Sequence, residues 1–219
     1  AKRAEMVGYA VHTSIAFSLV AGVGMMIVGI TAAPWALRAM STPEDILGPS
    51  TIYIRIYFLG VIGNLIYNMG AGILRAVGDS KRPLYFLIVS CLTNIVLDIA
   101  FVIGLHMGVA GAALATILSQ ALSAVLVLWV LMRTKDMHRL ELSKIRFDGR
   151  MFHRIIRIGL PAGLQSVMYT SSNILIQSSV NALGTDTVAA WTAYSKIDSL
   201  FWMIVNAFGI SITTFVGQN

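Results

Sequence analysis

Two side chains that can bind a cation stand four residues apart inside a long apolar stretch. The stretch 84–104 reads LYFLIVSCLTNIVLDIAFVIG and contains Asn94 and Asp98. As an α-helix it would be about 31 Å long, which is enough to cross a membrane. Residues four apart share a helix face, so the amide and the carboxylate lie together. The pair predicts a cation site inside the membrane, because an intramembrane aspartate needs a partner, a cation or water. A structural Asp98 bonded to a neighbouring helix is the alternative.

Other apolar stretches also carry polar residues at helical spacing. Thr116, Ser119, Gln120 and Ser123 form one stripe, in which small hydroxyls can bond their own backbone but Gln120 cannot be explained so easily. The remaining candidates for the lining of a polar cavity are Asn64, Asn68, Tyr169, Asn173, Gln177 and Asp198.

The composition is that of a membrane protein. Hydrophobic residues make up 57% of the 219-residue chain and charged residues 12%, and the mean hydropathy is +0.77. We predict an all-α polytopic membrane protein with six transmembrane helices, over approximately 7–33, 46–74, 84–105, 109–132, 155–180 and 188–216. Pro34 is expected to end the first span. Gly78 suits a left-handed helix cap, and Pro83 suits the first turn of the next helix.

The basic residues predict how the spans are oriented. If the spans alternate, thirteen lysines and arginines in loops and at the N-terminus share one side, and Arg38 alone lies on the other. The positive-inside rule places the first set, both ends of the chain and the loop 133–154 in the cytoplasm. We therefore expect a multi-pass protein of the plasma (inner) membrane.

Several classes of function are not supported by the sequence. There is no GxxxxGK[ST] loop for ATP, and the four histidines lack zinc-ligand spacing. The basic residues lie in loops between spans, as in membrane proteins, which argues against nucleic-acid binding. We expect no enzyme activity, no catalytic residues and no cofactor. A non-transporting structural subunit remains an alternative, although the polar stripes give a scaffold no advantage.

Four motifs resemble the multidrug and toxic compound extrusion (MATE) family. They are LRAVGDSKRP (74–83), NIVLD (94–98), GVAGAALATILSQ (108–120) and RIGLPAGLQS (157–166). The resemblance implies a twelve-helix, two-lobe antiporter fold, of which this chain holds helices three to eight. Residues 1–132 would be part of the N-terminal lobe, 133–154 a basic cytoplasmic linker and 155–219 the start of the C-terminal lobe. The chain is then expected to be a fragment that lacks the remainder of the same polypeptide.

The resemblance also implies a function and a site. The function is antiport of small organic cations or amphiphilic drugs against sodium ions or protons across the lipid bilayer. Asn94, Asp98 and Thr116 match the family's cation-binding positions, and they are also the only expected place for a metal ion, sodium. A further aspartate of that site would lie before residue 1, and the acid that some members carry on helix seven is absent here. The coupling ion, sodium or proton, stays open. A flippase for lipid-linked saccharides on the same fold is the alternative.

Overall fold

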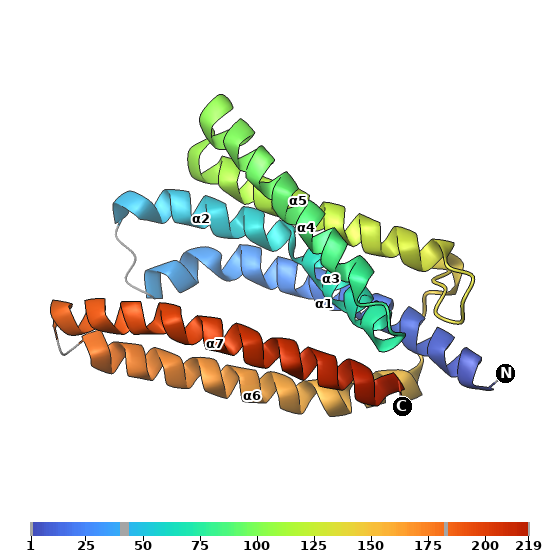
Figure 1. Ribbon diagram of the computed structural model, residues 1–219. Coiled ribbons are helices and arrows are strands. Elements are labelled where there is room, and N and C mark those ends of the chain that lie inside the picture. Colours follow the sequence, from blue (N-terminus) through green and yellow to red (C-terminus); the bar gives the residue numbers. More distant parts are fainter. Residues whose placement is uncertain (1, 40–43, 182–183, 219) are drawn as a thin grey trace. The chain divides into compact units, whose positions relative to one another are not determined.

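The computed structural model describes residues 2–39, 44–181 and 184–218, which are almost entirely helical (Figure 1). This confirms the predicted all-α class. The chain divides into two compact units, Ala1–Phe152 and His153–Asn219. The first unit contains α1 (Lys2–Ala39), α2 (Glu44–Leu59), α3 (Val61–Ala76), α4 (Lys81–Asp98), the π-helix η1 (Ile99–Gly104), α5 (Gly108–Arg133) and the 3₁₀ turn η2 (Leu142–Lys144). The helix α6 (Gly149–Asn181) begins at the end of the first unit, and with α7 (Thr185–Gln218) it forms the second.

Within the described residues, four helical segments are long and apolar enough to cross a membrane by themselves. They are α1, α4 with η1, α5 and α7, and the bent pair of α2 and α3 is a fifth candidate. The fifth predicted span, 155–180, corresponds to α6, which does not meet the same criterion. Basic residues open this helix, and a polar stripe runs along it.

The predicted span 46–74 is divided into two helices that meet at an angle of 42°. The division falls at Gly60, between α2 and α3. A Cβ atom at Gly60 would collide with the side chain of Ile117 on α5. The absence of a side chain therefore lets α5 approach the bend closely, which the hydrophobic pattern alone could not indicate.

The expectation that Pro34 ends the first span is wrong, since α1 continues to Ala39. A proline inside a helix leaves the carbonyl four residues earlier without its usual N–H donor. Here that carbonyl belongs to Ile30, and the Nε of Arg55 donates to it at 3.3 Å from the neighbouring helix α2. The arginine thus compensates for the hydrogen bond that proline removes.

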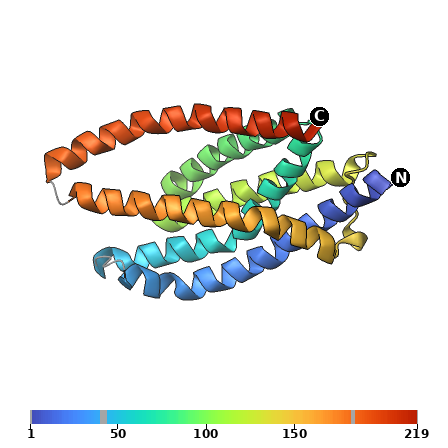
Figure 2. The same ribbon diagram turned by 90° about the horizontal axis from the view of Figure 1, so that it is seen from below.

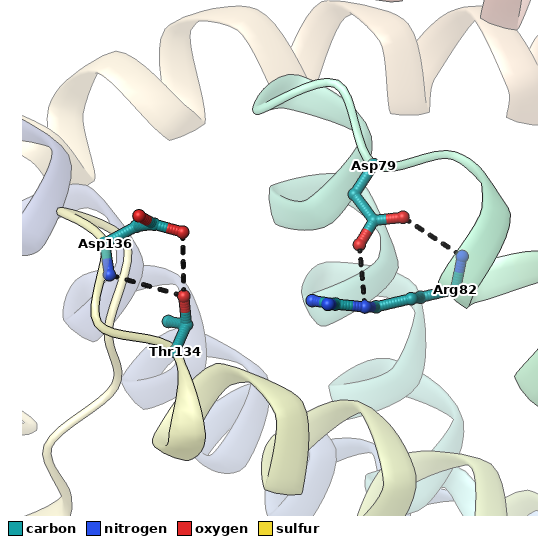
Figure 3. A network of polar contacts seen from close by, with 4 residues as sticks. All are labelled: Asp79, Arg82, Thr134 and Asp136. Atoms are coloured by element: carbon teal, nitrogen blue, oxygen red, sulfur yellow. Dashed lines mark hydrogen bonds and ion pairs between the residues drawn. The ribbon is translucent and has the colours of Figure 1, made fainter.

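The turn between α3 and α4 has the predicted chemistry. Gly78 adopts φ +92°, and the N–H of Asp79 donates to the carbonyl of Leu74 at 2.9 Å, which closes the end of α3. Pro83 is buried in the first turn of α4. Asp79 also accepts a hydrogen bond from the backbone N–H of Arg82 at 3.1 Å and pairs with its guanidinium at 3.2 Å (Figure 3).

The core of the first unit joins α1, α3 and α5. Its central members are Val11, Ile15, Leu74, Val127 and Leu131, each 2% exposed or less. Around this core, α5 packs against α2, α3 and α4, and α1 packs against α2 and α3. Figures 1 and 2 show α4 and α5 side by side as an antiparallel pair. This pair positions the predicted cation site.

The segment 134–148 is docked onto α1. The buried His12 accepts a hydrogen bond at Nε2 from the N–H of Glu141 at 3.1 Å, and its Nδ1 lies 2.6 Å from the carbonyl of Gly8. The hydroxyl oxygen of Thr13 accepts from the N–H of Asp148 at 3.1 Å. Leu140, 2% exposed, belongs to the core itself. The basic segment is therefore part of the first unit up to Phe152.

Candidate functional site

Asn94 and Asp98 lie at the C-terminal end of α4, and both side chains are partly buried. The α-helix ends at Asp98 and gives way directly to the π-helix Ile99–Gly104. A π-helical turn is wider than an α-helical one and is frequent at functional sites. The predicted span 84–105 is thus helical as far as Gly104, but its geometry changes at the acid. Sequence periodicity contained no signal for this change.

Three buried side-chain polar atoms in the described part of the chain have no hydrogen-bond partner. They are Nδ2 of Asn94, Oδ1 of Asp98 and Oε1 of Gln120. A buried polar group without a partner costs about 1–3 kcal/mol, and more if it is charged. All three residues were predicted from the sequence as site candidates. Two of these atoms, Oδ1 of Asp98 and Oε1 of Gln120, are oxygens of the kind that binds a small hard cation, whereas Nδ2 of Asn94 is an N–H donor.

Thr116, the third predicted cation ligand, lies on α5. Its hydroxyl donates to the carbonyl of Ala112 at 2.9 Å, so its oxygen retains lone pairs that can accept a further interaction. The buried Ser90 on α4 donates to the carbonyl of Ser119 at 2.7 Å and joins the two helices at this level. The antiparallel pairing therefore brings Thr116 near the level of Asn94.

The remaining hydroxyls of the α5 stripe bond to their own helix. Ser119 donates to the carbonyl of Thr116 and Ser123 to that of Gln120, each at 2.8 Å. These bonds satisfy the serines locally, as small hydroxyls in apolar helices commonly do. Gln120 alone in the stripe keeps an unsatisfied buried atom, which agrees with the distinction that the sequence suggested.

The two candidates on α3 bond to each other. Nδ2 of Asn68 donates to Oδ1 of Asn64 at 2.7 Å and lies 2.8 Å from its carbonyl. This local pairing satisfies the polar atoms that it joins within one helix. Asn64 and Asn68 stay predictions as cavity residues, since nothing in their contacts points to a ligand.

The second unit contains a polar and aromatic groove of about 1050 Å³ between α6 and α7. Four predicted cavity residues line it: Tyr169, Asn173, Gln177 and Asp198. The ring of Tyr169 meets the ring of Trp202 edge to face, with centroids 6.0 Å apart, and this contact joins the two helices. Asp198 is partly buried and forms no ion pair with any described residue.

Three aromatic residues of this groove were missed from the sequence. Trp191, Tyr194 and Trp202 line it together with Asp198 on α7. Their spacing from Asp198, seven and four residues before and four after, is that of a single helix face, so periodicity could have found them. Rings and one carboxylate on a shared face are the groups that recognise organic cations.

A separate cavity of about 670 Å³ lies between the first turns of α1 and the segment 134–148. Charged residues of both signs line it, and the guanidinium of Arg146 lies 5.2 Å from the ring centre of Tyr9. Lys144 pairs with Glu141 at 2.9 Å, and this hydrogen bond lowers the pKa of Glu141. No predicted site residue lines this cavity.

A second local network joins Thr134 and Asp136 at the end of α5 (Figure 3).

The described residues contain no group of three or more His, Cys, Asp or Glu side chains that could hold a metal ion. A transition-metal centre built from such ligands is therefore not present in the ranges 2–39, 44–181 and 184–218. A monovalent ion needs fewer charged ligands and more neutral oxygens, and the residues around Asp98 supply that type of ligand.

Known sequences resemble this chain over much of its length. A sequence model of the MatE family matches residues 1–100 and 161–219. The probable multidrug resistance protein YoeA of Bacillus subtilis is 31% identical over 228 residues, which cover 100% of this chain and 49% of YoeA. The probable multidrug resistance protein NorM of Thermotoga maritima is 26% identical, over 76% of this chain and 36% of NorM. The chain spans about half the length of YoeA and less of NorM.

Solved structures agree with these sequence matches. A MATE protein solved in its bent conformation superposes with a TM-score of 0.82 and 26% identity, over 96% of this chain and 52% of that one. An inward-facing multidrug resistance MATE family transporter of the MOP superfamily superposes with a TM-score of 0.70 and 26% identity, over 90% of this chain and 50% of that one. The arrangement of helices described above is therefore that of about half of such a protein.

Proposed function

This chain belongs to the MatE family, and from that premise we propose that it is part of a secondary antiporter. The transporter exports small organic cations or amphiphilic drugs in exchange for sodium ions or protons. The observation that carries the proposal is the unsatisfied carboxylate of Asp98 beside Asn94 on an apolar helix. Such an acid is costly in a membrane unless it binds something, and a coupling cation meets that need.

We propose that cation binding at Asp98 drives the transport cycle. A sodium ion or proton that reaches Asp98 from outside neutralises its charge and removes the cost of burying it. The packing of α4 against α5 that is stable with a neutral acid then differs from the packing that is stable with a charged one. This difference shifts the population between inward-open and outward-open arrangements, which is alternating access.

The groove between α6 and α7 supports a role in substrate binding. Aromatic rings attract organic cations, and Asp198 supplies a charge of opposite sign. Multidrug resistance is what the names of YoeA and NorM state, and the groove gives this chain a surface with suitable chemistry. We propose that it forms one wall of the drug cavity.

The complete transporter in this proposal is longer than the present chain. Tyr169, Asn173 and most other side chains along α6 and α7 are exposed in this chain, including polar ones that lipid cannot satisfy. Helices from the remainder of the same polypeptide would cover them. In this assignment, residues 1–132 belong to the first lobe, 133–154 connect the lobes and 155–219 begin the second.

Transport by the full-length protein tests the function directly. We expect everted membrane vesicles that contain it to accumulate ethidium when a sodium or proton gradient is imposed, because the cation then moves in the opposite direction. Fluorescence of ethidium reports the uptake, and vesicles without the protein are the control. Ethidium uptake that is the same with and without the sodium and proton gradients would contradict the antiport mechanism.

The loops predict that the segment 134–148 faces the cytoplasm of the plasma membrane. In full-length protein with Cys91 replaced by serine, we expect Ser143→Cys to resist a membrane-impermeant thiol reagent applied to intact cells. A cysteine at Thr185→Cys should react, because it follows the next span. Both should react after the cells are permeabilised. Labelling of Ser143→Cys from outside would reverse the proposed orientation.

A further inference from the structure

Gln120 has a buried, unbonded side-chain oxygen that neither its helix nor the predicted cation site explains. It lies in the middle of α5, a helix apolar enough to cross a membrane, and its Oε1 is buried without a hydrogen-bond partner. A glutamine that serves only to join helices is expected to use its polar atoms in hydrogen bonds. The neighbouring serines do so, and Gln120 does not.

The packing of α4 on α5 places Gln120 about five residue rises, roughly 7.5 Å, from Asn94 along the helix pair. The hydrogen bond from Ser90 to the carbonyl of Ser119 sets these two residues at one level. Gln120 follows Ser119 directly, and Asn94 lies four residues after Ser90. In an α-helix, side chains lean toward the N-terminus of their own helix. Because the helices are antiparallel, the side chains of Gln120 and Asn94 lean toward each other.

Residues on α3 do not satisfy Gln120. The backbone of α3 comes close at this point, since a Cβ atom on Gly63 would lie 3.6 Å from the carbonyl carbon of Gln120. The nearby amides of Asn64 and Asn68 are instead bonded to each other. The unsatisfied atoms of Asn94 and Gln120, an N–H donor and an oxygen acceptor, are complementary but not bonded to each other.

We propose that Gln120 is a further cation-ligating residue, which shares with Asn94 an inner binding position one helical turn from Asp98. The amide of Asn94 presents its oxygen to the ion by rotating about χ2. Two neutral amide oxygens bind a sodium ion but do not accept a proton at ordinary pH, so this position requires a metal cation. The inference rests on the proposed antiport at Asp98 and adds the ligand and the ion.

Sodium binding to the full-length protein in detergent tests this inference, with ²²Na⁺ as the probe. Replacing one neutral oxygen by a thioether of similar shape, Gln120→Met, should weaken sodium affinity roughly tenfold. Gln120→Glu keeps an oxygen at the same place and should retain binding. Ser123→Ala is the matched control: it is a buried residue of the same stripe whose hydroxyl is already bonded, and sodium affinity should not change.

The result separates this inference from the proposed function. If Gln120→Met binds sodium as tightly as the parent while Asp98→Asn does not bind it, Gln120 is structural and the inference is overturned. A parent protein that binds no sodium would also overturn it and would leave proton antiport as the proposed function. A variant that has lost its fold is recognised by its melting temperature, and Gln120→Glu then decides the matter.

Discussion

The substitution Asp98→Asn is expected to abolish cation-driven drug efflux by the full-length transporter. Asparagine keeps the shape of the side chain but removes the charge that a coupling cation neutralises. Residue 98 is then neutral with or without the ion, so ion binding no longer changes the cost of burying it in the membrane. The gradient therefore cannot shift the conformational equilibrium. Ethidium uptake by everted vesicles under an imposed sodium or proton gradient should fall to the level of vesicles without transporter.

Insertion into the membrane should survive this change, because a buried charge has been removed rather than added. Asp45→Asn is a suitable control, since Asp45 is an exposed acid in the first turn of α2 and its loss should leave efflux unchanged. Full activity of Asp98→Asn would show that Asp98 has only a structural role. The orphaned Oδ1 would then need a partner from another part of the protein.

The second large effect is expected at the groove of the second unit. Asp198→Asn should weaken the binding of a permanent organic cation, such as tetraphenylphosphonium, by roughly tenfold to a hundredfold. Asp198 is the acid in a groove that also holds the rings of Tyr169 and Trp202. Loss of a charge-assisted contact of this type costs about 1.5–3 kcal/mol, which corresponds to that range. Equilibrium dialysis with the full-length protein measures it.

A neutral amphiphile of similar size is the control for Asp198→Asn, and its affinity should hardly change because the rings remain. Trp202→Ala should instead weaken both ligands, since it removes a wall of the groove. Equal loss of the charged and the neutral ligand on Asp198→Asn would indicate a collapsed groove. Unchanged affinity for the cation would place the drug cavity elsewhere.

Local rules predicted much of the helical framework. The left-handed conformation of Gly78 and the position of Pro83 were both predicted correctly, because each depends on a few neighbouring residues. Pro34 was expected to end the first span, but α1 continues past it, and Arg55 donates to the carbonyl that proline leaves free. A compensating contact between residues so far apart in the chain is invisible to a rule that considers one segment at a time.

The candidate site shows the same division. Asn94, Asp98 and Gln120 were identified by type and spacing, and each keeps an unsatisfied buried atom in the structure. The hydrogen bond between Asn64 and Asn68 could have been predicted from the sequence, because the two residues are four apart on one helix. The π-helix after Asp98 could not have been predicted, because an α-helix and a π-helix have the same apolar composition.

By itself, the sequence determined the helical class, the apolar segments and the polar residues that share a helix face, because these follow from composition and from the 3.6-residue period. Tertiary structure decided which faces meet. The bond between Ser90 and Ser119 sets the register of Gln120 against Asn94, and Gly60 leaves room for α5 at the bend between α2 and α3. Such contacts depend on how two helices slide and rotate against each other, and no single helix contains that information.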